Sequence, residues 1–561
     1  MPLFLFKRRT DPAAAAAPLT AEQAMCIKLP TEAERTRLRV AYQERKGWRP
    51  RPDRPAVPFT LPFDWTADPF ADANWRFQLH AWRPLDVYIG LHCRGGDAAA
   101  YRFLIDAMLD WGRAESRGRR KTAFWGDMAA GIRAAKLAYV LSQPEFGQES
   151  RLRQAAVIRL ARRHLARLRD PDFIARSNHA LAQIHGAAAL CHVAPHWPEA
   201  EGGKAYVSDL LSRLLLSQFG RRGVHLEHSP GYHFFALREF RRMAETGWFD
   251  NADLDRTIRA AARAAPWFVF PDETSSAAGD SSPIRRPVPA PVVKDPVVGR
   301  LFREAGYGVV RAAWGRPANK SPMLLVTCGH HSNVHKHADD LSFELFDWGR
   351  RLFVDTGKYS YSASPMRDFS VSARAHNTID LALGRDDNGL ALTPPAGGGL
   401  TGMKRTRWGW VISGRIERPA IGVAHQRRFL YRPGQWLILL DRVTADEPRD
   451  LTAWLHLHPS VHAEETPDGW RWKKLTIRHV ADHPLALRRI RGQQEPLQGW
   501  MAADYHKAVE NDALAADWRG QGGRLATIIG LGRGHAPPEV RLTEDDFEVV
   551  WRGASLSIPR E

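Results

Sequence analysis

The hydrophobic pattern of the chain changes once, and this change limits the folds that it can adopt. From about Asp68 to Phe268, apolar residues recur at three- and four-residue spacings, separated by short Gly, Pro or Asp punctuation. This spacing predicts amphipathic helices. Beyond about Gly306, apolar residues form short alternating or continuous runs, such as 323–327 and 435–441, with turn signals between them. Because such runs predict antiparallel strands, we expect an α+β chain with helices first and a sheet domain second.

The 561 residues exceed what one hydrophobic core usually holds, so we expect several domains. Residues 1–60 are rich in Ala, Pro and Arg and predict an N-terminal arm with one helix around Glu32–Arg45. Paired helices without intervening strands indicate a bundle, solenoid or toroid over 61–305. Within this region, 271–297 is rich in Pro and Ser and predicts a loop or linker. The strand pattern then continues without a break, so we assign 306–561 to one β-sandwich.

The chain is strongly basic, with a formal net charge of +18 from 80 Lys and Arg against 62 Asp and Glu. Such a charge attracts polyanions, among them nucleic acids, anionic membranes and acidic polysaccharides. No recognisable nucleic-acid-binding motif accompanies it, and we expect no nucleic acid partner. No stretch approaches the roughly 20 apolar residues of a membrane span. The charge therefore narrows the partner to a polyanion without naming it.

The N-terminal sequence bears on the location of the protein. A short apolar run precedes the Lys-Arg-Arg cluster, which is the reverse of the order in a secretory signal. We therefore expect a cytoplasmic protein, with a periplasmic location left open. The four cysteines are scattered singly and predict neither a disulfide framework nor a thiolate metal site. The oligomeric state is left open, with a homodimer among the alternatives.

Histidines and a carboxylate gather in HSNVHKHADDLSFELFDWGRRLFVDTGKYSY, residues 331–361, and just beyond it. His335 and His337 are two residues apart, so on an extended strand they project from the same face. Asp355 closes a second predicted strand, and His376 follows in ARAHNTIDL. Histidines and a carboxylate brought together from sheet edges can bind zinc. Clustered histidines are also common on polar surfaces, and the spacing alone leaves both interpretations open.

Two segments of the helical half carry further polar candidates. RSNHALAQIHG places Asn178 and His179 at the start of a predicted helix, where such residues often cap. GVHLEHSPGYHFF places Glu227, Tyr232 and His233 around a Ser-Pro-Gly turn. Taken singly, each of these residues is more often a capping or packing residue than a catalytic one.

Taken in order, the motifs SNH, EHSPGYH, HKHADDLSFEL, DTGKY and AHNT resemble those of the heparinase II/III family of polysaccharide lyases. The family includes heparin and heparan-sulfate lyases and related alginate lyases. The resemblance runs from about Trp75 to Asp441, and WRFQLHAWRPL and Gly279–Asp280 are also similar. It implies an incomplete (α/α) helical toroid followed by an antiparallel β-sandwich. It further implies that the partner is an acidic polysaccharide or oligosaccharide, cleaved beside a uronic acid by β-elimination to leave an unsaturated uronic end.

The resemblance implies four catalytic residues. Asn178 would neutralise the uronic carboxylate, because the proton beside a charged carboxylate is hardly acidic. His179 would be a base candidate near C5. Tyr232 would protonate the departing glycosidic oxygen, or act as both acid and base, although Tyr at its usual pKa of about 10 needs positive neighbours to be a base. His335 would assist at the carboxylate.

The resemblance also implies a cofactor and a set of residues that contact the substrate. One zinc ion per chain, in a structural or supporting role, would be held by His337, Asp355 and His376. The residues expected to bind substrate are Glu227, His233, Tyr361 and Arg374.

Two other functions remain alternatives. HKHADD, residues 335–340, is similar to the HxHxDH motif of zinc-dependent hydrolases, but it ends in Asp340 where that motif has His. A non-catalytic acidic-glycan-binding protein is the second alternative, and the complete set of candidate catalytic residues argues against it. Gln183 stands where some family members carry Glu, which leaves the substrate class open.

Overall fold

The computed structural model describes residues 17–25, 33–51, 54–117, 124–361, 363–381, 397–532, 536–544 and 546–558. The chain divides into two compact units. The first comprises Met1–Ser217 and Glu239–Asp255, and the second comprises Gln218–Arg238 and Arg256–Glu561. The expected domains 1–60, 61–305 and 306–561 were divided by the type of secondary structure. The two compact units are divided by packing, so their boundaries fall at other residues.

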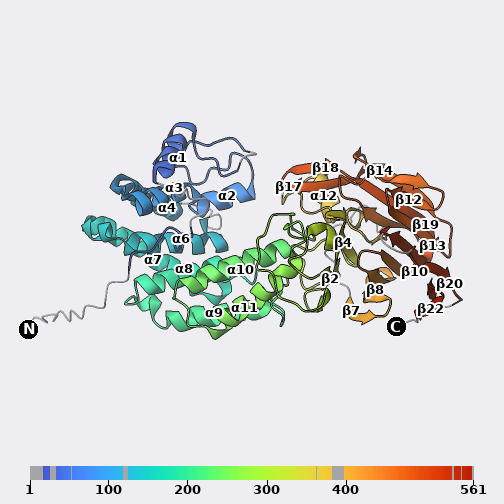
Figure 1. Ribbon diagram of the computed structural model, residues 1–561. Coiled ribbons are helices and arrows are strands. Elements are labelled where there is room, and N and C mark those ends of the chain that lie inside the picture. The colour runs from blue at the N-terminus through green and yellow to red at the C-terminus, as the bar shows by residue number, and fades with distance from the viewer. Residues whose placement is uncertain are drawn as a thin grey trace, which may run out of the picture. The chain divides into compact units, whose positions relative to one another are not determined.

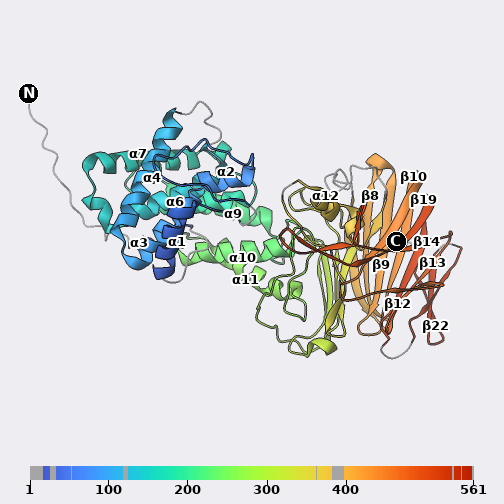
Figure 2. The ribbon, with the colours of Figure 1, turned by 90° about the horizontal axis from the view of Figure 1, so that it is seen from above.

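Helices occupy the N-terminal part of the chain, coloured blue to green in Figures 1 and 2. The α-helices described before the first strand are α1 (Ala33–Lys46), α2 (Ala73–His80), α3 (Asp86–Gly95), α4 (Ala98–Arg117), α6 (Asp127–Ser142), α7 (Arg151–Leu168), α8 (His179–Val193), α9 (Gly203–Gln218), α10 (Pro230–Glu245) and α11 (Ala252–Ala264). The helix expected around Glu32–Arg45 is α1. None of the described helices combines the length and apolarity needed to cross a bilayer.

Helices α6 and α8 approach each other very closely in the first unit. Residues 180–190 of α8 are all buried, as expected of a helix that is apolar on every side. Two glycines permit the approach. A Cβ atom at Gly131 of α6 would lie 2.2 Å from the carbonyl oxygen of Ala182, and one at Gly186 would lie 2.2 Å from the carbonyl oxygen of Gly131.

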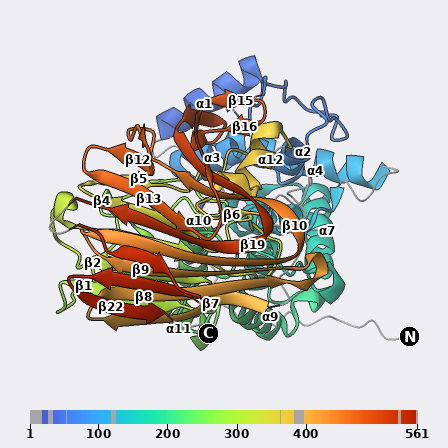
Figure 3. The same ribbon diagram turned by 90° about the vertical axis from the view of Figure 1, so that its right-hand side faces the viewer.

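Two antiparallel sheets form most of the second unit. The first is a meander of β1 (Val297–Phe302), β2 (Tyr307–Ala312), β3 (Met323–Thr327), β4 (Ser342–Asp347) and β5 (Arg350–Phe353). The second has ten strands, several of which lie side by side in Figure 3: β11 (Glu464–Thr466), β12 (Gly469–Trp472), β13 (Leu475–Ala481), β19 (Asp512–Gly530), β10 (Trp436–His456), β9 (Val423–Arg432), β8 (Gly409–Arg418) and β7 (Gly397–Thr406), with β14 (Ala486–Arg491) on β19 and β6 (Ile379–Asp380) on β10.

The remaining described elements of the second unit are short. They are helix α12 (Pro365–Val371) and the strands β15 (Gln493–Gln494), β16 (Leu497–Gln498), β17 (Trp500–Asp504), β18 (Lys507–Glu510), β20 (Glu539–Leu542), β21 (Phe547–Trp551) and β22 (Ala554–Ile558).

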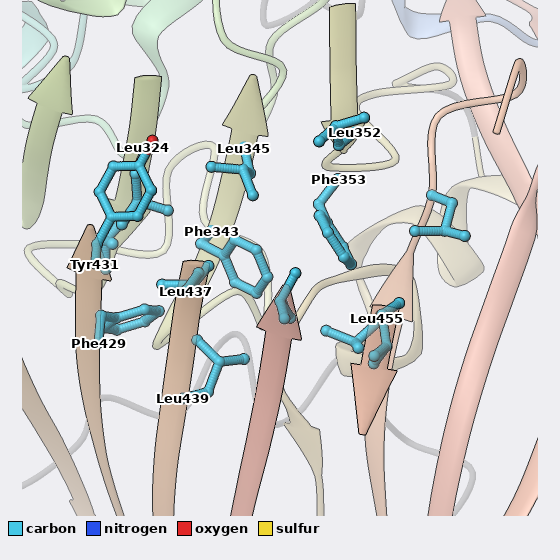
Figure 4. Close-up of a cluster of buried hydrophobic side chains, with 14 of the residues drawn as sticks. Leu324, Phe343, Leu345, Leu352, Phe353, Phe429, Tyr431, Leu437, Leu439 and Leu455 are labelled. Atoms are coloured by element: carbon cyan, nitrogen blue, oxygen red, sulfur yellow. The ribbon is translucent and has the colours of Figure 1, made fainter. Parts of the chain in front are cut away.

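The two large sheets share one core (Figure 4). Leu324 and Phe343 of the first sheet and Phe429, Leu437 and Leu439 of the second are at most 1% exposed. Burial of such side chains contributes roughly 1.5–3 kcal/mol each. The predicted order, a helical region followed by antiparallel sheets packed face to face, is confirmed.

Residues 271–296 form a loop without helix or strand, as the sequence allowed, but the middle part of this loop is not an exposed linker. Residues 275–281 are buried in the second unit. The Ser276 hydroxyl and the Ala277 backbone N–H both donate to the Glu344 carboxylate, and Arg351 donates to the carbonyl oxygen of Ser275 at 2.9 Å. A Ser-rich composition also suits a buried loop when such partners satisfy its polar groups, and the sequence pattern does not reveal those partners.

Candidate functional site

Tyr232 lies in the first turn of α10, and several contacts fix that turn. The Ser229 hydroxyl oxygen accepts a hydrogen bond from the Tyr232 backbone N–H at 3.3 Å, as an N-cap does. Pro230 is the first helical residue, where no N–H donor is needed. Ser281 contacts the same turn, with its hydroxyl 2.8 Å from that of Ser229 and accepting from the Gly231 N–H at 2.9 Å. The direction of the Tyr232 side chain is therefore set by its surroundings.

The Tyr232 side chain is the centre of an aromatic and cationic cluster. Its ring stacks on that of His335, with centroids 3.5 Å apart and planes at 20°. Its hydroxyl lies 2.8 Å from the Tyr361 hydroxyl, which in turn accepts a hydrogen bond from the Lys358 ammonium at 2.9 Å. Burial raises the pKa of Tyr232 to about 12, despite the lowering effect of the Tyr361 hydrogen bond. At neutral pH the Tyr232 hydroxyl is thus protonated and can donate a proton.

Asp280 is a buried carboxylate that organises the histidines. One oxygen lies 2.9 Å from His335 Nδ1, and the other lies 3.0 Å from His337 Nε2 and accepts from Arg367 at 2.5 Å. Burial alone would raise the pKa of Asp280, but these hydrogen bonds and the charge of Arg367 hold it well below its usual value. Because Nδ1 of His335 is bound to Asp280, Nε2 is the nitrogen left for proton exchange. It lies 3.6 Å from the Glu227 carboxylate.

Backbone strain accompanies this cluster. His228 and His335 have φ values of 55° and 57°, in the left-handed region that few non-glycine residues adopt. The His228 Nε2 accepts hydrogen bonds from the backbone N–H of His331 at 3.1 Å and of Ser332 at 3.3 Å. Burial lowers the pKa of His228 to about 2, so it stays a neutral acceptor. Such strained residues concentrate at functional sites, where the surrounding contacts hold them.

The three predicted metal ligands are all buried in the second unit. His376 Nδ1 lies 2.8 Å from one Asp355 oxygen, and the rings of His337 and His376 are 5.4 Å apart. His337 Nδ1 and His376 Nε2 are buried without a hydrogen-bond partner, as nitrogens that await a ligand would be. The Asp355 carboxylate is instead occupied by His376 and the Gly357 N–H. In the part of the chain that the structure describes, no three His, Cys, Asp or Glu side chains are grouped as metal ligands.

The carboxylates of the HKHADD segment lie in a buried ion-pair network. Lys336 donates to Asp339 at 2.5 Å and to Asp340 at 3.0 Å, and Arg418 donates to Asp340 at 2.8 Å. Asp340 is the position that would be a metal ligand in the hydrolase motif. Here it is neutralised by two cations, which weakens the likeness to that motif.

Asn178 and His179 belong to the first unit. Asn178 precedes α8, and the exposed His179 ring has Nδ1 3.1 Å from the carboxylate of Asp127, at the start of α6. The hydrogen bond with His179 lowers the pKa of Asp127. Gln183 is buried and structural, since its side chain donates to the Phe173 carbonyl and accepts from the Ala175 N–H, both at 2.8 Å. It therefore fixes the loop that leads to Asn178.

The four predicted substrate-binding residues have different surroundings. Glu227 and Tyr361 lie beside His335 and Tyr232. His233 is buried, with Nε2 3.1 Å from the Ala261 carbonyl oxygen and Nδ1 accepting from a backbone N–H, so both ring nitrogens serve packing. Arg374 lies in a short 3₁₀ helix, Ala373–Ala375, and its carbonyl oxygen accepts from His456 and Gln498.

Sequence reasoning missed three members of the site: Asp280, Lys358 and Arg367. The sequence indicates Gly279–Asp280 only as part of a family pattern, and the composition around it predicts a loop or linker. The glycine was the available signal, because its φ is +59° and a Cβ there would lie 2.2 Å from the His228 carbonyl oxygen. Lys358 lies within the DTGKY motif, but the motif does not mark its side chain as part of the site, and no sequence pattern indicates Arg367.

Two protein-family models match consecutive parts of the chain. The model of the heparinase II/III N-terminus matches residues 33–295, and the model of the heparinase II/III-like C-terminal domain matches residues 295–519. These matches adjoin and together span most of the chain. It belongs to the heparinase II/III family.

Individual relatives are distant. A heparin-sulfate lyase of Bacteroides stercoris is 22% identical over 243 residues, which is 37% of this chain and 36% of that protein. The match thus spans about a third of that relative. A crystal structure of heparinase III superposes with a TM-score of 0.74 at 15% identity, covering 95% of this chain and 91% of that one. A heparan sulfate lyase from Pedobacter heparinus gives 0.65 at 16% identity, covering 96% and 92%. These structures share the fold predicted above.

Proposed function

We propose that this protein is a polysaccharide lyase that cleaves a uronic-acid-containing glycan or oligosaccharide by β-elimination. The observation that carries the proposal is the Tyr232 cluster, in which the tyrosine ring stacks on His335 and its protonated hydroxyl is hydrogen-bonded to Tyr361. Membership of the heparinase II/III family supports it, as does the resemblance to a protein named as a heparin-sulfate lyase.

In this reaction a base removes the proton from C5, a C4–C5 double bond forms, and the bond from C4 to the glycosidic oxygen breaks. Tyr232 gives its proton to that oxygen. The Lys358 ammonium is hydrogen-bonded to the Tyr361 hydroxyl, which is hydrogen-bonded to the Tyr232 hydroxyl. Through these contacts the proton that Tyr232 has given up is replaced. His335, held at Nδ1 by Asp280, presents Nε2 for assistance at the uronic carboxylate. Charge held in place before the reaction lowers the barrier because it needs no reorganisation.

The roles of Asn178 and His179 follow from the family motif. Asn178 neutralises the uronic carboxylate, and His179 is the base that removes the C5 proton, because Tyr232 is protonated at neutral pH and serves as the acid. Asp127 supports the second role, because a carboxylate on Nδ1 orients an imidazole and fixes which nitrogen exchanges the proton.

The test is the absorbance of the unsaturated uronic end, measured with a panel of acidic glycans that includes heparan sulfate, hyaluronan, alginate and glucuronan. The expected result is a rise with at least one glycan, lost in Tyr232→Phe and kept in Tyr42→Phe, which changes an exposed tyrosine of the first unit. Cleavage without new absorbance would indicate a hydrolase. Binding without cleavage would indicate a non-catalytic glycan-binding protein. Either result would overturn the proposal.

We also propose that His337, Asp355 and His376 hold one zinc ion in a supporting role. The two unpartnered imidazole nitrogens support this, while the Asp355 carboxylate would have to change partners. Zinc would supply a fixed positive charge there. Metal analysis of the purified protein should give about one zinc per chain, lost in His376→Ala and kept in His462→Ala, which removes an exposed histidine. Retention of zinc in His376→Ala would refute this ligand set.

A further inference from the structure

A cationic pocket in the second unit shares no lining residue with the Tyr232 cluster. It has a volume of about 300 Å³ and lies between the turn at 220–223, helix α11 and strand β1. Its described lining includes four arginines on two aromatic residues: Arg221, Arg222, Arg263 and Arg300, with Trp267 and Phe302. We call these six residues the arginine pocket.

The turn that carries two of these arginines is firmly seated. Gly223 has a φ of +74°, and a Cβ there would lie 2.4 Å from the Ala260 carbonyl carbon, so only glycine lets the turn rest on α11. The Arg221 backbone N–H donates to the Glu304 carboxylate at 2.5 Å. The Arg222 guanidinium donates to the Leu301 carbonyl oxygen at 3.0 Å. The rim of the pocket is therefore built before any ligand arrives, which lowers the cost of binding.

The charge of the arginine pocket is not balanced locally. None of the described residues that line it is acidic, and the neighbouring Glu304 carboxylate lies 3.5 Å from the guanidinium of Arg221, which is one of the four. Burial lowers the pKa of Arg300, and the charge of Arg222 lowers it further. An oxyanion between these side chains would relieve the repulsion. Guanidinium groups bind carboxylate and sulfate through two parallel hydrogen bonds, which makes them suited to such ligands.

The floor of the pocket indicates which polyanion fits. Trp267 and Phe302 are only 7% and 4% exposed, and the Arg300 guanidinium lies over the Trp267 ring, 5.5 Å from its centroid. The ring face is therefore covered, whereas single-stranded nucleic acids need open aromatic faces on which bases stack. A volume of about 300 Å³ is at the lower end for small-ligand sites and suits one or two sugar units.

We propose that the arginine pocket is an ancillary binding site for a carboxylate- or sulfate-bearing sugar unit of an acidic glycan. The proposal rests on the proposed function for the identity of the glycan. A chain bound there and at the Tyr232 cluster would be held at two points, so long glycans bind more tightly than short ones.

The test is the affinity for a fluorescein-labelled heparin dodecasaccharide, measured by anisotropy in the Tyr232→Phe background. Arg222→Ala/Arg300→Ala should weaken binding about tenfold, which corresponds to about 1.4 kcal/mol. The matched control is Arg151→Ala/Arg159→Ala, which removes the same charge from exposed positions of α7 in the first unit. Its affinity should stay within about twofold of the parent. Equal weakening by both pairs would show a general charge effect and overturn the proposal.

Two further measurements separate this proposal from its alternatives. Arg263→Glu, at an exposed position of α11, should weaken binding as well, and it covers the case in which the double variant unfolds. A single-stranded DNA of equal charge that bound the arginine pocket more tightly than the glycan would overturn the assignment to a glycan. If no lyase activity is found but dodecasaccharide binding still depends on Arg222 and Arg300, the binding site is supported and the proposed lyase activity is refuted. If lyase activity is found but dodecasaccharide binding is unaltered in these variants, the lyase activity is supported and the proposed binding site is refuted.

Discussion

Replacing Gly131 by alanine tests how helices α6 and α8 position the His179–Asp127 pair. The added Cβ would lie 2.2 Å from the Ala182 carbonyl oxygen and 2.3 Å from its carbonyl carbon. Favourable contacts between non-bonded carbon atoms lie at about 3.5–4.0 Å. Because the obstacle is backbone rather than a mobile side chain, the helices must separate by roughly 1 Å, judged against that contact distance.

Two opposing effects decide the stability of Gly131→Ala. Alanine gains about 1 kcal/mol of helix propensity over glycine. Overpacking a buried contact costs about 1–3 kcal/mol and occasionally more. With three backbone atoms of Ala182 and Gln183 inside contact distance we expect the upper end, and a net loss of about 2 kcal/mol in the free energy of unfolding. The hydrogen bond of 3.1 Å between His179 and Asp127 does not survive a separation of that size, so lyase activity should fall as well.

The assay is thermal unfolding followed by tryptophan fluorescence, together with the lyase rate. For a unit of this size, 2 kcal/mol corresponds to a fall in Tm of roughly 4–8 °C. Gly147→Ala is the control, because no atom lies within 4 Å of a Cβ at that position. If Gly131→Ala melts at or above the wild-type temperature, the argument that the helix contact requires glycine is refuted.

Three further results are expected within the second unit. Asp280→Asn keeps the side-chain shape but removes a buried charge, so we expect a loss of about 3–5 kcal/mol in stability and a clear fall in lyase rate; wild-type thermal unfolding would contradict the role of Asp280. Tyr232, with a pKa of about 12, should be ionised in only about one molecule in 10⁴ at pH 8. Proton donation by Tyr232 should therefore persist through pH 10 and fall as the pH rises through 12, and the tyrosinate absorbance lost in Tyr232→Phe should appear only near that pH; a midpoint near 9 would contradict this. Lys358→Met removes the ammonium bound to Tyr361 and should lower kcat by about 10²-fold, the lower end for a group that supplies a proton, with little change in KM. A changed KM alone would indicate substrate binding instead.

The fold was largely predictable because the residues that pack in the core recur at regular spacings in the sequence. In β4, Phe343 and Leu345 face the core between the sheets, and Phe346 packs with Phe268 and Phe270 on the other side. The alternation of apolar residues over 341–346 predicts this strand. The burial of Glu344 on the same strand could not be predicted, because it depends on Ser276 and Ala277, which lie 68 and 67 residues earlier in the chain.

The candidate site was predictable only where its residues fall in motifs. Tyr232 and His335 were found in this way, and the structure brings them into ring contact. Asp280 binds His335 across 55 residues of chain through a loop without periodicity, so neither spacing nor composition indicates the pair. His233 shows the opposite case, since it stands in a motif but its ring nitrogens bind the backbone.

The course of the chain between the two units has a consequence for recombination and truncation. The chain leaves the first unit after Ser217, returns at Glu239 and leaves again after Asp255. No single cut can therefore release either unit whole, and a chimaera joined at 297 would separate Asp280 from the histidines that it orients. Exchange of the first unit between relatives needs three junctions. The segment Gln218–Arg238, which carries Tyr232, must come from the same protein as the sheets.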